Sequence, residues 1–373
     1  MAESSPILTN FTSGELSPRL NGRIDMEKYY NGASKLSNFA VLMHGGLQKR
    51  SGTKFIREIK TSTGSNSGAR LIPFVFSKTQ AYILEFGHNY IRFYKDEGVI
   101  VSSGTTPYEI STTYTAAQIN ELEYVQSADI LYLVHEAHPP RKLSRTGHTS
   151  WTISDVDFFD GPYEAANTSS TTMQPSGTSG NITITASSSV FVANDVGRSI
   201  RIKNGSDWGF AKITGYNSAT NVNATVNADM PFAATSANAD WRLGSFYIGN
   251  YPTKVTFFEE RLFYAGTTQQ PSTVFSSMSA DFDKFSPTSK DGSVNDDNGL
   301  QFTIVSDQVN QITGLYGGKF LAIFTKNGAF NMSSGSATQG ITPTTIQVTN
   351  ETNDGAADKR VSPASKSVLF IGK

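Results

Sequence analysis

The chain has 373 residues with 31 basic and 32 acidic side chains, no cysteine, and 17% charged residues, against roughly 25% in an ordinary globular protein. With 38% hydrophobic residues, among them 24 Phe and 15 Tyr, it has ample apolar surface to bury, which argues against a wholly disordered chain. The absence of cysteine excludes a disulfide framework, a thiolate metal site and a cysteine nucleophile.

The start of the chain is a basic arm that precedes an acidic body. Residues 1–60 hold nine Lys/Arg against five Asp/Glu, whereas residues 61–164 hold seven against twelve. The basic residues of the arm are spread out rather than clustered, which favours a solvated or protein-contacting arm over a nucleic-acid-binding one. The first twenty residues lack the basic and apolar regions of a signal peptide, and no run is long and apolar enough for a membrane helix. We therefore expect neither a secreted nor an integral membrane protein.

Short strands are the dominant local signal along the rest of the chain. Eight runs are apolar, β-branched or aromatic and are bounded by Gly, Asn, Asp or Pro: residues 71–76, 81–86, 91–94, 130–134, 261–265, 273–277, 320–324 and 368–371. A further strand is expected at residues 54–59, after a tight turn. The best helix candidate is residues 115–123, where Thr115 could cap and Ile119 and Leu122 are three residues apart. The pattern predicts an all-β protein.

Five of these runs resemble one another, which indicates an internal repeat. They read YILEF, ILYLV, RLFYA, FLAIF and VLFIG, and their starts are separated by about 48, 131, 59 and 48 residues. The anomalous interval contains residues 166–189, in which fifteen of 24 residues are Ser, Thr or Asn. It also contains a compact set of expected strands, at residues 182–184, 190–192, 199–202, 210–213 and 221–226, closing at Trp241. Removing residues 166–243 as an inserted β-domain restores a period of about 50 residues.

A period of about 40–50 residues with several strands per unit is typical of β-propeller blades. A β-sandwich is the alternative, since short strands with regular turns fit it too. The fifth run ends at Lys373 in a hairpin with no evident partner strand, so we expect a propeller that is incomplete in this chain, because the chain is a fragment or because another segment completes the blade. The expected organisation is an N-terminal arm and first strands (1–60), a first set of blades (61–165), an inserted small β-barrel or sandwich (166–243) and further blades (244–373).

Catalytic and metal-binding signatures are weak, and we predict no catalytic, cofactor-binding or metal-ligating residue and no cofactor. HGGLQKRSGTK at His44 has the glycines and Lys of a phosphate-binding loop in the wrong order. His135 and His138 lie at i and i+3 near a strand end, whereas zincins use i and i+4 on a helix. DGSVNDDNG at Asp291 lacks the spaced ligands of an EF-hand. SRTGHTSW at Ser144 has Thr where the structural turn of sialidase-like propellers has Asp, and no carboxylate pair for glycoside hydrolysis can be chosen.

Several stretches together resemble the tail nozzle proteins (tail tubular protein B type) of short-tailed bacteriophages. The N-terminal segment NFTSGELSPRLNGRIDMEKYYNGASKLSNFAVLMHGGLQKRSGTKFI, from Asn10, is similar to the opening of that family. Further matches are DGPY, WRLGSF, YPTKVTFFEERLFYAG, FDKFS, FTIVSDQVNQI and ITPTTIQV. Proteins of this family usually continue well beyond a segment like SVLFIGK, which again suggests a partial chain.

The resemblance implies a structural, non-enzymatic virion protein of a phage tail, assembled in the host cytoplasm. It would form a homo-oligomeric ring of six copies below the portal and adaptor rings, with tail fibres as further partners. Double-stranded DNA would leave the capsid through this ring without specific binding, and the ring would help to retain the genome. A low density of charged residues suits the wall of such a channel, because Lys/Arg contacts to phosphates would bind the DNA as it passes.

Under this hypothesis the basic arm contacts the adaptor or a neighbouring copy. Phe11 and Leu16 would be apolar anchors, while Arg19, Arg23 and Arg50 would make charged contacts to an acidic surface. The alternative is that the arm wraps its own propeller. Two other functions remain open: a carbohydrate-active propeller that degrades capsule or receptor, and a general DNA-binding module.

Overall fold

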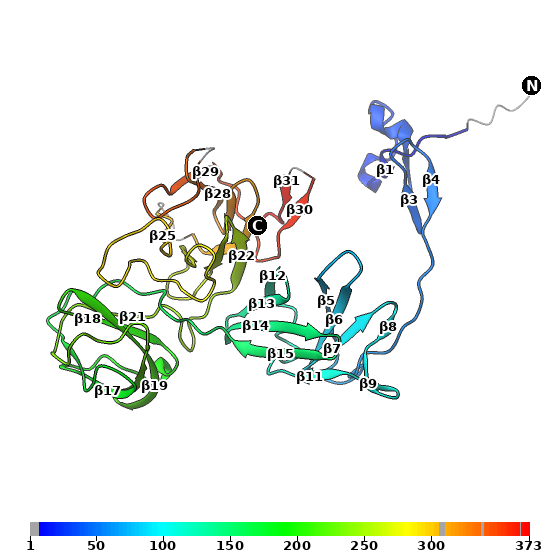
Figure 1. Ribbon diagram of the computed structural model, residues 1–373. Coiled ribbons are helices and arrows are strands. Elements are labelled where there is room, and N and C mark those ends of the chain that lie inside the picture. The colour runs from blue at the N-terminus through cyan, green and yellow to red at the C-terminus, as the bar shows by residue number, and fades with distance from the viewer. Residues whose placement is uncertain (1–6, 306–309, 337–338, 366) are drawn as a thin grey trace, which may run out of the picture. The chain divides into compact units, whose positions relative to one another are not determined.

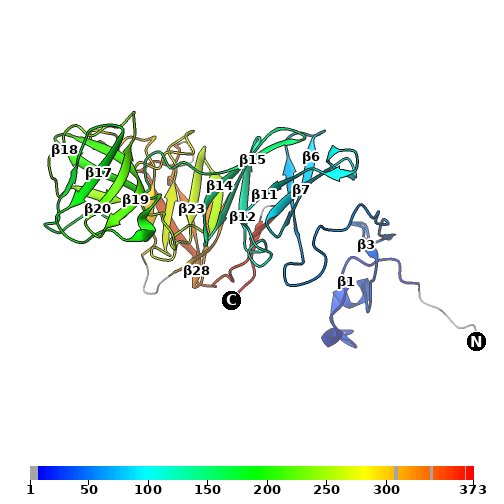
Figure 2. The same ribbon diagram turned by 90° about the horizontal axis from the view of Figure 1, so that it is seen from below.

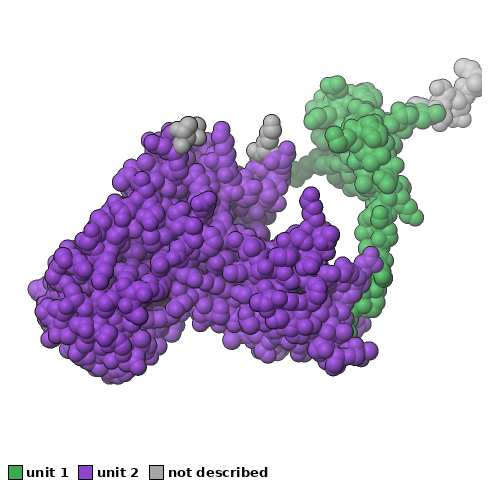
Figure 3. Space-filling model, viewed as in Figure 1, with its two compact units in different colours: residues 1–57 green, residues 58–373 purple. Residues whose placement is uncertain are grey.

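The computed structural model describes residues 7–305, 310–336, 339–365 and 367–373. Residues 306–309, within the FTIVSDQVNQI stretch, fall outside this description. The chain divides into two compact units, residues 1–57 and 58–373, which are coloured separately in Figure 3. Within the described residues no helix is long and apolar enough to cross a membrane.

The N-terminal unit consists of short elements with almost no core. It holds a parallel pair, β1 (Gly14–Glu15) and β2 (Gly32–Ala33), and a hairpin of β3 (Phe39–Val41) and β4 (Leu47–Lys49). Two 3₁₀ turns, Pro18–Leu20 and Glu27–Asn31, lie between β1 and β2. The prediction of a strand at residues 54–59 is wrong, because this segment forms no strand and Phe55 is 77% exposed.

The larger unit contains four antiparallel sheets that follow one another along the chain (Figures 1 and 2). These sheets contain seven of the eight predicted runs, which are therefore confirmed as strands within one or two residues. The strands of the first sheet are β5 (Arg70–Val75), β6 (Ala81–Gly87), β7 (Tyr90–Lys95), β8 (Gly98–Val99) and β11 (Glu109–Ser111). Those of the second are β12 (Glu123–Ser127), β13 (Ile130–His135), β14 (His138–Gly147) and β15 (Ser150–Asp155).

The third and fourth sheets repeat the same four-strand order. The third consists of β22 (Lys254–Phe258), β23 (Arg261–Ala265), β24 (Thr273–Ser276) and β25 (Gln301–Thr303). The fourth consists of β26 (Ile312–Gly317), β27 (Leu321–Thr325), β28 (Gly328–Ser333) and β29 (Gln347–Thr352). A small pair, β9 (Val101–Ser103) with β10 (Thr106–Pro107), extends the first sheet's outer loop.

The second strand of each sheet explains why the sheets stack face to face. Successive side chains of a strand point to opposite faces, so an apolar run without alternation must be covered on both sides. In β13, Leu131 and Leu133 join a core cluster shared with the first sheet, whereas Tyr132 and Val134 join one shared with the third. β23 divides its side chains between the second and fourth sheets in the same way.

The four sheets are thus blades of a β-propeller, each packed on the next in chain order. Their first strands lie innermost: β12 packs beside β22 and β22 beside β26. The side-chain amide of Gln126 in β12 joins β5 to this group, because it accepts from the Val75 N–H (2.9 Å) and donates to the Val75 carbonyl (2.8 Å). The all-β fold class expected from the repeat is therefore confirmed.

In the chain, a six-stranded sheet with its own core comes after the second blade and before the third; it is shown in green in Figure 1. Its strands, in spatial order, are β16 (Met173–Pro175), β17 (Asn181–Ala186), β20 (Asn221–Val226), β19 (Asp207–Ser218), β18 (Ser199–Asn204) and β21 (Trp241–Leu243). Residues 190–192, expected as a strand, have no strand and lead into a short 3₁₀ turn at Ala193–Asp195. The incoming and outgoing chains pair through a bridge between Tyr163 and Gly244, so the sheet is inserted through one double-stranded neck.

Two further predictions are wrong. Residues 115–123 form turns rather than a helix, because Ile119 and Leu122 are both buried in the core between the first two blades and β12 begins at Glu123. The fifth repeat has a partner strand: β31 (Ser367–Leu369) pairs with the preceding β30 (Ser362–Ala364). Val368 and Phe370 of this repeat pack on the fourth blade.

The inter-blade core generates a stability prediction. Leu133→Ala removes a fully buried side chain shared by two blades and is expected to lower the free energy of unfolding by about 2–5 kcal/mol. The matched control is Ile83→Ala, on the central strand of the first blade, where the side chain is 41% exposed and the expected loss is about 0.5 kcal/mol. Urea unfolding followed by tryptophan fluorescence measures both, and equal losses would contradict face-to-face packing of the blades.

Candidate functional site

The five residues predicted to contact a partner all lie in the N-terminal unit, and they differ in how far their side chains are buried. Phe11 and Leu16 are half-buried, whereas Arg19, Arg23 and Arg50 are exposed. Leu16 packs tightly over Gly32, where an added Cβ would lie 2.5 Å from the Leu16 side chain. Its role as an anchor is therefore at least partly internal to the unit.

The three arginines differ in how far their charge is already paired. Arg23 makes two hydrogen bonds of 2.7 Å to the Asp25 carboxylate, and this pair raises the pKa of Arg23 and lowers that of Asp25. No hydrogen bond to an acidic side chain involves Arg19 or Arg50 among the residues described. Arg19 and Arg50 are therefore the arginines of this set that remain open for an acidic partner.

The sequence analysis missed the main feature of this unit, which is its exposed apolar surface. Of residues 7–57, only Gly45 is buried. Six large apolar or aromatic side chains are at least half exposed: Ile7 (86%), Ile24 (65%), Tyr30 (59%), Phe39 (50%), Met43 (99%) and Phe55 (77%). These side chains, called here the arm surface, follow no strand or helix period, so sequence pattern could not have separated them from a core.

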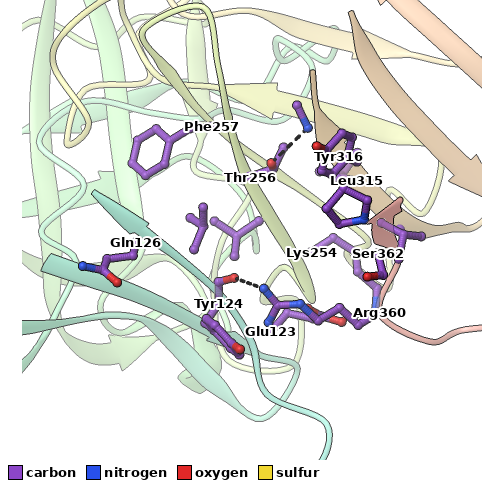
Figure 4. Close-up of a pocket in the computed structure, with 16 residues that line it drawn as sticks. Glu123, Tyr124, Gln126, Lys254, Thr256, Phe257, Leu315, Tyr316, Arg360 and Ser362 are labelled. Atoms are coloured by element: carbon purple, nitrogen blue, oxygen red, sulfur yellow. Dashed lines mark hydrogen bonds and ion pairs between the residues drawn. The ribbon is translucent and has the colours of Figure 1, made fainter. Parts of the chain in front are cut away.

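A second candidate site is a cavity of about 560 Å³ where the innermost strands of three blades meet (Figure 4). β12, β22 and β26 supply three walls, and residues 360–363, which lead into β30, supply the fourth. The Arg360 guanidinium lies 3.7 Å from the centre of the Tyr124 ring and donates a hydrogen bond to the Tyr124 carbonyl (3.4 Å). Residues 358–363, called here the C-terminal segment, are thereby held beside the innermost strands of the blades.

Lys254 is the charged centre of this axial region. The residue is only 6% exposed. Its ammonium lies 2.6 Å from the Asp358 carboxylate and 3.8 Å from the Glu123 carboxylate. It therefore joins β12, β22 and the C-terminal segment. A lysine inside an otherwise apolar strand run, PTKVTFF, was the sequence signal that could have identified it.

The acidic side chains of the axial region divide unequally between two cavities. Among the residues that line the larger cavity, only Glu123 is acidic, whereas glycoside hydrolysis uses two carboxyl groups on either side of the bond. A smaller cavity of about 290 Å³ beside it gathers Glu121, Glu136 and Asp358 as well. Of these, Asp358 is paired with Lys254 and Glu121 lies 3.2 Å from His135.

Three histidines of the first two blades bind the segment that connects them. His88 accepts a hydrogen bond from the Ala116 N–H (3.3 Å), His135 contacts Glu121, and His138 lies 3.0 Å from the Gln118 side-chain oxygen. Among the described residues, no group of three or more His, Cys, Asp or Glu side chains could hold a metal ion. The histidine pair singled out in the sequence therefore contacts a connecting segment.

Comparison with known proteins adds no family. No protein-family model matches the chain, and no curated protein matches it. Among solved structures, BamB from Moraxella catarrhalis is similar, with a TM-score of 0.22 and 9% identity, over 78% of this chain and 76% of BamB. A likeness this weak carries no argument about function.

Lys254→Met tests the axial ion pairs. We expect the free energy of unfolding to fall by about 1.5–3 kcal/mol, because the Asp358 carboxylate loses a charged hydrogen bond and Glu123 loses an ion-pair partner. We also expect faster trypsin cleavage after Lys359 and Arg360, in the segment that Lys254 holds. The exposed Lys319→Met is the control. Unchanged cleavage in Lys254→Met would contradict the role of Lys254 in holding this segment.

His138 generates a pH prediction. Burial, with smaller contributions from Arg141 and His135, lowers the pKa of His138 to about 4 from its ordinary value of 6.5. Between these values the unfolded chain binds a proton that the folded chain does not, so this contribution to stability is lost as pH falls from 6.5 to 4. His138→Gln is expected to show a shallower fall in Tm over this range, and parallel curves for the two proteins would contradict the assignment.

Proposed function

We propose that the protein is a structural component of a short-tailed phage tail, which assembles with copies of itself and with an adaptor into a ring for DNA ejection. The arm surface is the observation that carries this proposal. An isolated unit with one buried residue among residues 7–57 has little to stabilise it, and burying each exposed Ile, Phe or Met on a partner contributes about 1.5–3 kcal/mol. Large exposed apolar patches mark interaction sites in soluble proteins, and the exposed apolar side chains of this small unit are the candidates for such a patch.

The segment that bears the arm surface is also the segment whose sequence resembles the opening of tail nozzle proteins. Such a ring would hold six copies below the portal and adaptor, in the virion, with tail fibres as further contacts. Arg19 and Arg50 would meet acidic groups of the adaptor or of the neighbouring copy at the rim of the apolar contact. Contacts of this type set orientation and association rate more than affinity.

The charge pattern of the larger unit supports passage of DNA without specific binding. Many basic side chains already have an acidic partner, and each such pair reduces the attraction to phosphates that makes binding salt-dependent. Examples are Lys142 with Asp283 (2.5 Å), Arg141 with Asp155 (2.9 Å), Arg145 with Asp129 (2.9 Å) and Lys212 with Asp157 (2.9 Å).

The double variant Ile24→Ser/Phe39→Ser tests this function. Both side chains are exposed, so the unfolding midpoint is expected to stay within about 0.5 kcal/mol of wild type, whereas association with copies or adaptor is expected to weaken at least tenfold. Analytical ultracentrifugation and electron microscopy, with the protein alone and with a portal–adaptor complex, measure the change.

The matched control is Val294→Ser, which removes an apolar side chain of similar exposure (53%) from the larger unit. Equal assembly by the double variant and the control would refute a docking role for the arm surface. Release of reducing sugar from host polysaccharide by the purified protein would instead favour the carbohydrate-active alternative.

A further inference from the structure

Two arginines of the inserted sheet face each other across neighbouring strands. Arg201 in β18 and Arg242 in β21 are directly opposite in the antiparallel register. Side chains in such positions share one face of the sheet, with Cβ atoms about 4.5–5.5 Å apart, and like charges placed there are destabilising. The pair therefore needs a compensating interaction.

The surroundings of the pair are largely shielded from water. Arg201 is only 1% exposed, and its guanidinium lies 4.1 Å from the centre of the Trp208 ring and 4.7 Å from that of Tyr163. The Arg242 guanidinium lies 5.9 Å from the same Trp208 ring. The two cations thus converge on one aromatic side chain.

The donors of both arginines are incompletely used. A guanidinium has five N–H donors. Arg201 donates to the Thr288 hydroxyl (3.2 Å), which lies in the loop between β24 and β25 of the third blade. The Nε atoms of Arg201 and Arg242 are both buried, and neither has a hydrogen-bond partner among the residues described. Buried donors without a partner are rare and destabilising.

The counter-charge next to the pair is too small to balance it. Asp160, 1% exposed, is the acidic group that interacts with Arg201, and its carboxylate already accepts a hydrogen bond from the Tyr163 hydroxyl. Burial raises the pKa of Asp160, which weakens its compensation further. The nearby Lys290 and Lys284 have carboxylates of their own, Asp207 (3.8 Å) and Asp281 (3.1 Å). Positive charge and unused donors therefore remain at the arginine pair.

We propose that Arg201 and Arg242 form a binding site for a small tetrahedral oxyanion, with inorganic phosphate as the representative ligand. Guanidinium groups suit such ligands because their planar fork donates two parallel hydrogen bonds to oxyanions. Arg242 is half-buried and Arg201 is enclosed, so a ligand of the pair would reach Arg242 first. Because Thr288 belongs to the third blade, the bound anion would also fix the inserted sheet against that blade.

The test is a phosphate titration of the full chain at constant ionic strength, with sodium chloride replaced step by step. We expect a saturable change in tryptophan fluorescence, since Trp208 contacts both guanidinium groups, and a rise in Tm that follows RT ln(1 + [L]/Kd). Arg242→Gln is expected to weaken phosphate binding at least tenfold. Lys290→Gln, which removes a nearby paired cation, is the matched control and is expected to bind as wild type.

Three results would overturn the proposal. The first is a non-saturable rise in Tm that is equal in wild type and Arg242→Gln, as general salt stabilisation by phosphate predicts. The second is the absence of any saturable response in the wild type, which decides the matter even if Arg242→Gln fails to fold. The third is displacement of phosphate by a short DNA duplex, which would assign the arginines to phosphodiester backbones rather than to a small anion.

Discussion

Coverage of both faces of a β-sheet is the constraint on which the rest of this structure depends. A four-stranded sheet whose central strand is apolar on every residue is unstable in water unless another sheet covers each face. β13 and β23 meet this requirement in the same way, because alternate side chains enter two different core clusters. Stacking of blades in chain order follows from this division, and the innermost strands are brought together around the axial cavity as a consequence.

The first blade follows the same rule, but only one face of its central strand packs on the second blade. Its central strand, YILEF, places Tyr82, Leu84 and Phe86 in the core shared with the second blade. On the other face, Ile83 is 41% exposed and Glu85 accepts a hydrogen bond of 2.5 Å from the Tyr90 hydroxyl. The glutamate that stands where other repeats have an apolar residue is nevertheless only 1% exposed, because Tyr90 and the segment at Lys60 cover it.

The two additions to the blade stack are stabilised by different means. The inserted sheet has its own apolar core and meets the third blade through a charged and aromatic group around Arg201, whose buried Nε has no hydrogen-bond partner among the residues described. The N-terminal unit has no comparable core and exposes the arm surface. Apolar surface that the chain does not cover itself is the physical basis for the proposed role in assembly, since the hydrophobic effect that would bury it is non-directional and large.

The sequence by itself determined the all-β class, because strand periodicity and turn residues are local signals, and the same signals predicted a blade period of about 50 residues with an insertion at 166–243. The sequence failed at residues 115–123, where burial of Ile119 and Leu122 between two blades overrides a weak helical pattern. It could not identify Lys254, Asp358 and Arg360 as one axial group, since Lys254 lies 104 residues before Asp358 and meets these residues only through tertiary packing. The same holds for Arg201 and Arg242: their charge is visible in the sequence, but only the register of β18 with β21 decides that two cations share one face of the sheet.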